Sequence, residues 1–206
     1  MLQGIHWLGH ASFRIEDSGV VIYIDPWKLQ NGKPADLILV THGHSDHLSP
    51  EDIAKIAQPS TVCVCPPACA KELSGDVRKL AAGQSAQIGE VRIEAVPAYN
   101  PGKRFHPQSA GNVGYIVEVG GRRIYHAGDT DVIPEMDTIR CDVALLPMGG
   151  TYTMNADEAA QAAGRIQPKV VVPMHWGDLV GQRSDVDRLA TLLPKEIKLA
   201  VLTPER

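Results

Sequence analysis

The sequence has few aromatic residues, 5% of 206, and no long apolar stretch. None of its apolar runs approaches the roughly 20 residues that a membrane-spanning helix needs, so membrane insertion is not expected. Its first residues combine no basic segment with a following apolar core, which predicts a cytoplasmic protein rather than a secreted one. A basic surplus is also missing, because 20 Lys and Arg stand against 24 Asp and Glu. This balance does not favour a nucleic-acid partner.

Several familiar sequence signals are absent as well. No internal repeat, low-complexity tract or linker divides the chain, which predicts one domain over residues 1–206. There is no GxGxxG opening a helix, no GxxxxGK[ST] and no GxSxG, so dinucleotide binding, P-loop chemistry and serine-hydrolase chemistry have no support. Cys63 and Cys65 alternate within an apolar stretch, which places them on one strand face as buried thiols of a reducing compartment.

Short apolar runs separated by capped helices predict mixed α/β or α+β packing in layers. The expected strands are 20–24, 37–41, 61–65, 91–96, 113–119, 123–126, 143–147 and 170–173, with a strand pair or one long strand at 5–15. The expected helices are 50–56 with Ser49 as cap, 156–165 with Asn155 as cap and Glu158 reaching back, and 184–193 with Ser184 as cap.

One loop is unusually rich in groups that bind metals. His42, His44, Asp46 and His47 form an HxHxDH pattern between an apolar strand and the Ser49 helix. A short loop at a strand end lets these side chains converge on one point. Imidazoles together with a carboxylate suit zinc, manganese or iron(II), and the mixture alone does not choose among them.

Other strand ends carry similar residues. Asp129 follows the strand 123–126 in a Gly-Asp-Thr turn, and His175 follows the strand 170–173. His106 lies in the loop after the strand 91–96, where Asn100 is an alternative oxygen ligand. Neutral imidazole binds these metals better, so His106 is the favoured candidate. This distribution is typical of a metal site assembled from several strand ends.

These motifs resemble those of the metallo-β-lactamase superfamily. They follow one another along the chain as HxHxDH, His106, Asp129 and His175, which is the order of that superfamily. The layout, with the segments 7–13 and 150–154, looks most like its small metal-dependent hydrolases. That branch includes ascorbate-6-phosphate lactonase and, more distantly, N-acyl-phosphatidylethanolamine phospholipase D. The resemblance implies a four-layer αββα sandwich with a binuclear metal site at one edge.

The resemblance also implies a role for each ligand. One metal would be held by His42, His44 and His106, the second by Asp46, His47 and His175, and Asp129 would bridge both. Two divalent ions are expected, zinc first, with manganese or iron as alternatives. A hydroxide shared by the metals would attack an ester, lactone, amide or phosphodiester bond. The catalytic carboxylates would be Asp129, which fixes the metal spacing, and Asp46, which orients the nucleophile and takes its proton.

The surroundings of the site leave alternatives open. Lys103, Arg104 and the amino end of the Asn155 helix are candidates for contacting an anionic substrate; a plain turn with charges facing water is the alternative. His10 is either structural or a hydrogen-bonding neighbour of the site, His126 has a supporting or structural role, and His6 is ordinary.

The leading interpretation is a hydrolase of a small-molecule substrate, and oligomer formation stays open. One alternative is a metal-dependent nuclease, which would require a basic track that the net charge of −4 does not suggest. A second is an iron-dependent redox enzyme of the same fold. The third is a noncatalytic metal-binding or partner-binding protein, which the complete set of ligands argues against.

Overall fold

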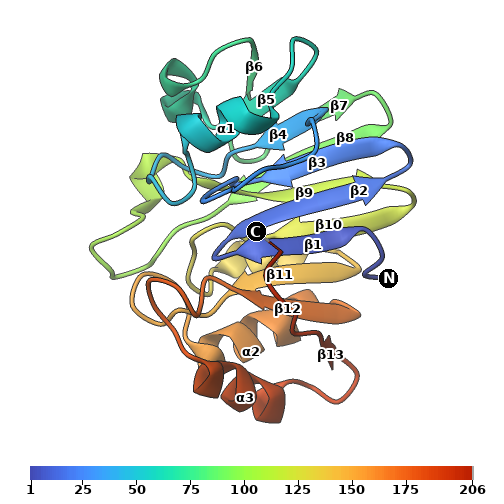
Figure 1. Cartoon of the computed structure of the whole chain (residues 1–206). Coiled ribbons are helices and arrows are strands. Elements are labelled where there is room, and N and C mark those ends of the chain that lie inside the picture. The colour runs from blue at the N-terminus through green and yellow to red at the C-terminus, as the bar shows by residue number, and fades with distance from the viewer. Residues whose placement is uncertain (206) are drawn as a thin grey trace.

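The computed structural model describes residues 1–205 and contains two mixed β-sheets that pack face to face (Figure 1). The first sheet has the spatial order β1 (Ile5–Gly9), β2 (Ser12–Asp17), β3 (Val20–Ile24), β4 (Leu37–Leu39), β5 (Val62–Cys65) and β6 (Asp76–Lys79). The second has the order β13 (Lys198–Leu199), β12 (Val170–Met174), β11 (Val143–Pro147), β10 (Arg122–His126), β9 (Val113–Val119), β8 (Val91–Pro97) and β7 (Ser85–Ile88).

Each sheet combines antiparallel hairpins with parallel strands. In the first sheet β1–β2 and β2–β3 are antiparallel, whereas β3 to β6 run parallel. In the second, β7 to β10 are antiparallel and β10 to β13 are parallel. Because the carboxyl ends of parallel strands meet at one edge, the loops after β3, β4, β10 and β12 can be brought together.

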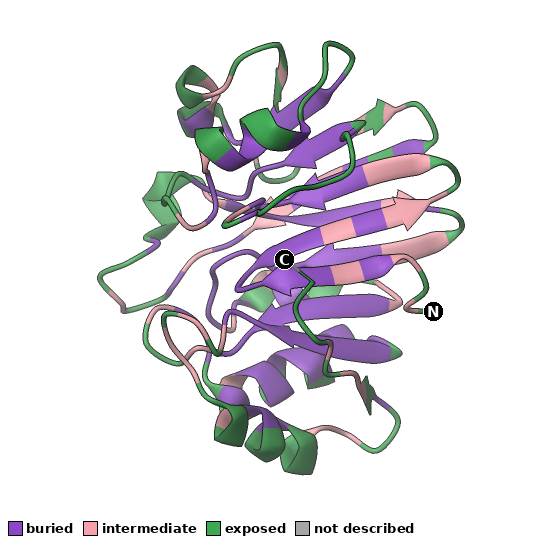
Figure 2. Cartoon of the chain, in the orientation of Figure 1, coloured by how far each residue is buried: buried purple, intermediate pink, exposed green. Residues whose placement is uncertain are grey.

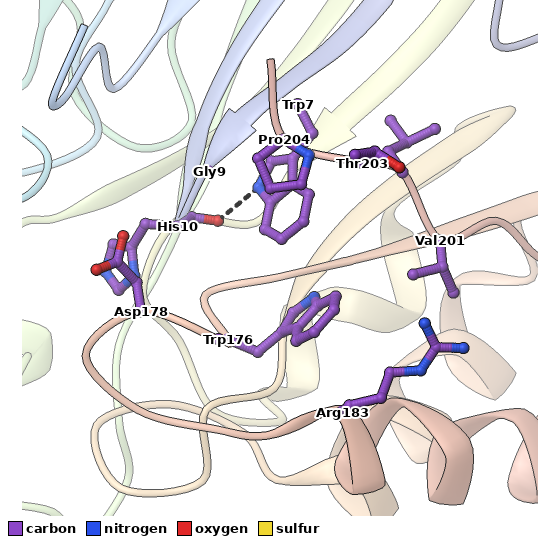
Figure 3. Close-up of a pocket in the computed structure, with 11 residues that line it drawn as sticks. Trp7, Gly9, His10, Trp176, Asp178, Arg183, Val201, Thr203 and Pro204 are labelled. Atoms are coloured by element: carbon purple, nitrogen blue, oxygen red, sulfur yellow. Dashed lines mark hydrogen bonds between the residues drawn. The ribbon is translucent and has the colours of Figure 1, made fainter. Parts of the chain in front are cut away.

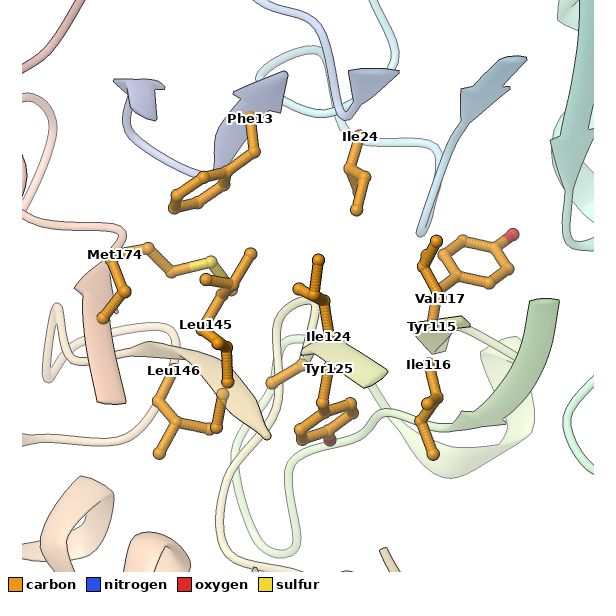
Figure 4. Close-up of a cluster of buried hydrophobic side chains, with 14 of the residues drawn as sticks. Phe13, Ile24, Tyr115, Ile116, Val117, Ile124, Tyr125, Leu145, Leu146 and Met174 are labelled. Atoms are coloured by element: carbon orange, nitrogen blue, oxygen red, sulfur yellow. The ribbon is translucent and has the colours of Figure 1, made fainter. Parts of the chain in front are cut away.

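The main hydrophobic core fills the space between the sheets. Phe13 and Ile24 of the first sheet point toward Ile124 and Leu145 of the second (Figure 4). Side chains alternate along a strand, so Tyr125 points the opposite way from Ile124. Along the central strands of the second sheet, β11 and β12, both faces are therefore buried (Figure 2).

Helices cover the outer faces of the sheets. The helix α1 (Pro50–Ile56) packs Ile53 and Ile56 with Cys63 and Cys65 in a second apolar cluster. The helices α2 (Ala156–Ile166) and α3 (Arg183–Leu192) pack together beside β11 and β12 (Figure 1). The predicted four-layer αββα arrangement is thus confirmed, and both cysteines are buried free thiols, as expected.

The capping predictions hold for two of the three helices. Ser49 caps α1, and Asn155 caps α2 with Glu158 reaching back. The third prediction is wrong by two residues: Gln182, not Ser184, is the cap of α3. The backbone N–H of Gln182 donates to Asp185 at 2.7 Å, and this contact starts the helix one residue before Ser184.

Three 3₁₀ helices complete the structure, at Pro67–Glu72, Gln108–Ala110 and Pro134–Thr138. Within residues 1–205, every helix is too short or too polar to cross a lipid bilayer.

Candidate metal centre

The loops at one edge of the two sheets bring all seven predicted ligands together. These loops gather on the left of Figure 1 and come from both sheets. The candidates are His42, His44, Asp46 and His47 between β4 and α1, His106 between β8 and β9, Asp129 after β10, and His175 after β12.

The ligand atoms form two adjacent groups, which a third set, His42, His47 and Asp129, connects. In the first, His44 Nδ1 lies 3.0 Å from His42 Nε2 and 3.0 Å from His106 Nε2. The second consists of Asp46, His47 and His175, joined by His10, and its ligand atoms lie within 4.8 Å of one another. Such a cluster of nitrogen and oxygen atoms is what a divalent transition metal requires.

Asp129 lies between the two groups. Its Oδ2 is 3.4 Å from His106 Nε2 and 3.2 Å from His175 Nε2, and its Oδ1 is 3.3 Å from His47 Nε2. One carboxylate therefore faces histidines of both groups, as a bridging ligand must.

Several of these buried atoms lack hydrogen-bond partners among the described residues. They are His47 Nε2, His175 Nε2 and Asp129 Oδ1. Leaving buried polar atoms unpaired costs about 1–3 kcal/mol each, which folded proteins usually avoid. Metal coordination would satisfy all three atoms, so the residues present fit divalent ions.

The turn that carries Asp129 is tightly constrained. Gly128 has φ +63°, and a Cβ there would lie 2.8 Å from the carbonyl oxygen of Val113. The ring of His126 donates from Nε2 to the carbonyl of Ala11 at 2.8 Å and accepts the Gly128 N–H on Nδ1. His126 therefore holds this turn through hydrogen bonds, in agreement with the supporting or structural role expected for it.

Backbone strain is concentrated at the site. Of the seven non-glycine residues with left-handed φ among the described residues, four are here: His10 (+52°), Asp25 (+48°), His106 (+54°) and His175 (+59°). This conformation is unfavourable for residues with a Cβ and persists where the surrounding structure enforces it, often at functional sites.

Asp25 is a functional residue that the sequence analysis missed. It is fully buried at the end of β3, and its Oδ2 accepts a hydrogen bond from His47 Nδ1 at 2.7 Å. Its two oxygens also accept the N–H and hydroxyl of Thr41, at 2.8 and 2.6 Å. A carboxylate behind a ligating histidine fixes the tautomer that directs Nε2 toward the metal. The available signal was a carboxylate directly after an apolar strand, the same pattern that identified Asp129.

His10 connects two predicted ligands of the second group. Its Nε2 lies 3.0 Å from Asp46 Oδ2, and its carbonyl accepts the backbone N–H of His175 at 2.9 Å. The rings of His10 and His175 are 3.9 Å apart between centroids. Of the two expected roles for His10, the structure shows the hydrogen-bonding neighbour of the site.

The alternatives His106 and Asn100 have different surroundings. His106 directs Nε2 toward His44 and Asp129, whereas the Asn100 amide donates to the carbonyl of Tyr152 at 2.5 Å. The backbone N–H of Asn100 also donates to the His106 carbonyl at 2.9 Å. This arrangement favours His106 as the ligand and Asn100 as a support for its loop.

Lys103 and the amino end of α2, which were predicted to contact an anion, make hydrogen bonds within the protein. Lys103 donates to Asp131 at 2.6 Å and to the carbonyl of Thr153 at 2.8 Å, so its charge is already paired within the protein. At the amino end of α2, Asn155 and Glu158 exchange hydrogen bonds of 2.8 and 2.9 Å. Arg104, the other predicted residue, is exposed beside Phe105. Recognition of a substrate anion by these groups stays a prediction.

The pKa values of the clustered histidines shift in opposite directions. Burial lowers the pKa of His42 and of His106, which keeps both rings neutral and able to donate a lone pair. Burial also lowers the pKa of His47, but the carboxylates of Asp129 and Asp25 outweigh this effect and raise that pKa to about 9.

Two hollows adjoin the cluster. The smaller, of about 240 Å³, opens onto the ligands His44, Asp46, His106, Asp129 and His175. The larger, of about 490 Å³, lies between Trp7, Trp176 and the C-terminal segment, and reaches His10 (Figure 3). Trp7 and Trp176 stack there with centroids 5.3 Å apart. Because the predicted ligands line the smaller hollow, chemistry at the cluster would take place there.

Comparison with known proteins agrees with the fold. The family described as "Beta-lactamase superfamily domain" matches residues 4–175, and the chain belongs to this superfamily. A UPF0173 metal-dependent hydrolase from Archaeoglobus fulgidus is 41% identical over 196 residues, which cover 84% of this chain and 82% of the relative. The chain is therefore a metal-dependent hydrolase of the metallo-β-lactamase superfamily.

Solved structures of related proteins have the same fold. A chain from Parabacteroides distasonis superposes with a TM-score of 0.87 at 33% sequence identity, covering 97% of this chain and 93% of that one. Igni18, a metallo hydrolase from Ignicoccus hospitalis, superposes with a TM-score of 0.80 at 26% identity, covering 98% and 95%.

Proposed function

We propose that this protein is a binuclear hydrolase that cleaves an ester, lactone or phosphodiester bond of a small substrate. The observation that carries the proposal is the position of Asp129 between two groups of ligand atoms, with contacts to His106, His47 and His175 of 3.2–3.4 Å. The proposed ligands of one metal are His42, His44 and His106, and those of the other are Asp46, His47 and His175. Zinc is the first candidate, with manganese and iron as alternatives.

Divalent ions bound here would supply a lowered pKa for water and polarisation of the scissile carbonyl or phosphoryl oxygen. The protein's own residues set the geometry. Asp46 lines the hollow, and the contact of its Oδ2 with His10 holds the carboxylate in place. We assign to Asp46 the role of accepting a proton from the attacking water. The water oxygen forms the new bond to carbon or phosphorus, the bond to the leaving oxygen breaks, and that oxygen takes the proton from Asp46.

The cysteines fit a cytoplasmic location. Cys63, Cys65, Cys69 and Cys141 are all free thiols, as is usual for proteins of reducing compartments.

The test uses chelator-treated protein reconstituted separately with Zn²⁺, Mn²⁺ and Fe²⁺. Each form is assayed on a panel of lactones and esters, on a generic phosphodiester and on bulk RNA. We expect metal-dependent hydrolysis of a small substrate, and a loss of at least about 100-fold in kcat for Asp46→Asn. Asp76→Asn is the matched control, because this carboxylate is exposed on β6 and pairs with Arg78.

Three results would overturn the proposal. Cleavage of RNA alone would indicate a nuclease. Oxygen consumption by the iron form without hydrolysis would indicate a redox enzyme. Tight metal binding without turnover of any of these substrates would favour a noncatalytic metal-binding protein.

A further inference from the structure

The hollow above the predicted metal ligands has two aromatic walls. Apart from the five ligands, its lining consists of Ser45, Phe105 and Tyr152. Phe105 is 42% exposed, although it lies next to the buried His106. A single exposed apolar side chain needs no explanation on most surfaces. This one lies at the mouth of a reaction site, where a bound substrate would cover it.

The two rings are held in a fixed arrangement. Phe105 and Tyr152 meet edge to face, with centroids 4.9 Å apart and planes at 84°, a favourable geometry for aromatic pairs. Their loops are tied together, because Asn100 donates to the carbonyl of Tyr152 and Lys103 to that of Thr153. The aromatic walls are therefore preorganised, so little conformational entropy would be lost on binding.

The charges that line this hollow do not favour an anionic substituent. Among residues 1–205, no lysine or arginine lines it; the nearby Lys103 is paired with Asp131, and the exposed Arg104 lies outside the lining. Its lining does include the carboxylates of Asp46 and Asp129. Once the scissile group is placed at the metals, a charged substituent would find no cationic partner in the lining, whereas an apolar one would find the two rings.

We propose that Phe105 and Tyr152 form a subsite for an uncharged aromatic ring attached to the scissile bond. The substrate class is then a neutral aryl or arylalkyl ester or lactone, not a sugar phosphate or another polyanion. The volume of about 240 Å³ suits one small ring beside the reacting group, since apolar cavities of about 150 Å³ accommodate benzene. This inference rests on the proposed hydrolase function and narrows its substrate.

The kinetic test compares variants on three acetate esters with the metal-loaded full chain. The alcohol parts are phenol, methanol and 4-hydroxybenzoate, which supply a neutral ring, no ring and a charged ring. We expect Phe105→Ala to lower kcat/KM for phenyl acetate by about 10- to 100-fold and for methyl acetate by less than about 3-fold. Phe105→Leu should retain most of the activity on phenyl acetate, because it keeps an apolar wall. Comparing each variant with wild type on the same ester removes the intrinsic reactivity of that ester.

The matched control is Leu192→Ala, which removes an apolar side chain of 40% exposure on α3, outside the hollow. It should leave all three esters unaffected. A second readout does not need turnover: benzyl alcohol binding to the metal-free protein is measured by saturation-transfer NMR. Wild type should show binding that Phe105→Ala loses and Leu192→Ala keeps.

The outcomes separate the two proposals. Equal losses on phenyl and methyl acetate in Phe105→Ala would overturn the subsite while hydrolysis itself stands. So would a wild-type preference for the charged ring after each kcat/KM is divided by the uncatalysed hydrolysis rate of that ester. Benzyl alcohol binding that depends on Phe105, in a protein that hydrolyses nothing with any metal, would support the subsite and reject the hydrolase.

Discussion

Replacing Asp25 by asparagine should weaken metal binding while leaving the chain folded. In the structure, Asp25 Oδ2 accepts the Nδ1–H of His47 at 2.7 Å, which leaves Nε2 of that ring free to bind a metal. An asparagine would present an NH₂ donor at this position. Its partner would then be an unprotonated Nδ1, which moves the proton of a neutral ring to Nε2 and directs it into the metal site.

The size of the effect follows from the contacts. Loss of such a supporting carboxylate typically reduces metal affinity by about 10- to 100-fold, equivalent to about 1.4–2.7 kcal/mol. The amide oxygen of asparagine can still accept the Thr41 N–H, which lies 2.8 Å from Asp25 Oδ1. We expect the free energy of unfolding to fall by about 1–3 kcal/mol, less than the 5–15 kcal/mol by which most domains are stable.

The assay is competition for Zn²⁺ between the protein and a fluorescent chelator of known affinity, with circular dichroism to verify folding. Asp76→Asn is the control, since it makes the same chemical change at an exposed carboxylate of β6. A folded Asp25→Asn variant with the zinc affinity of wild type would show that Asp25 does not set the tautomer of His47.

Three further predictions concern proton release, the contact between His10 and Asp46, and backbone packing. Since the pKa of His47 is about 9 without metal, metal binding at pH 7 should release a proton from this ring, and the affinity for the metal should rise with pH up to about 9. Calorimetry in buffers of different ionisation enthalpy tests this proton release. A heat of metal binding that does not depend on the buffer would contradict it. His10→Ala should lower kcat by about 10-fold or more, whereas His10→Gln should retain part of the wild-type kcat, because glutamine can still donate to Asp46. Equal kcat values for the two variants in steady-state kinetics would contradict this. Urea unfolding should show Gly164→Ala stabilised by about 0.5–1 kcal/mol, because Gly164 is on the exposed face of α2 and a Cβ there meets nothing within 4 Å. Gly114→Ala should be destabilised by about 1–3 kcal/mol, because its Cβ would lie 2.7 Å from two carbonyl oxygens. The opposite order of stabilities would contradict the packing.

The buried parts of the fold could be predicted from the sequence because they carry a local signal. The strands at 20–24, 113–119 and 143–147 begin and end at the predicted residues. The edge strands β6, β7 and β13 were missed, since their residues are mostly exposed or half-buried and show no apolar pattern. Such strands form only because a neighbouring strand offers free backbone groups.

The candidate site likewise has a part that local sequence signals predict and a part that depends on contacts between distant residues. Its ligand candidates could be predicted, because HxHxDH and strand-end residues are visible along the chain. Two contacts could not: Asp25 reaches His47 only because β3 and β4 lie side by side, with Ile24 opposite Leu39. Likewise, Lys103 is engaged by Asp131, and no local pattern places these two residues together.

The number of metal ions bound per chain decides whether the site is binuclear. Elemental analysis should be made on protein purified without chelators or metal-affinity resin, alongside His42→Ala and His175→Ala, which remove a proposed ligand of the first and of the second metal, respectively. We expect two zinc, manganese or iron ions per wild-type chain and at most one in each variant. A wild-type chain that holds one ion or none, even after reconstitution with excess metal, would contradict the binuclear site.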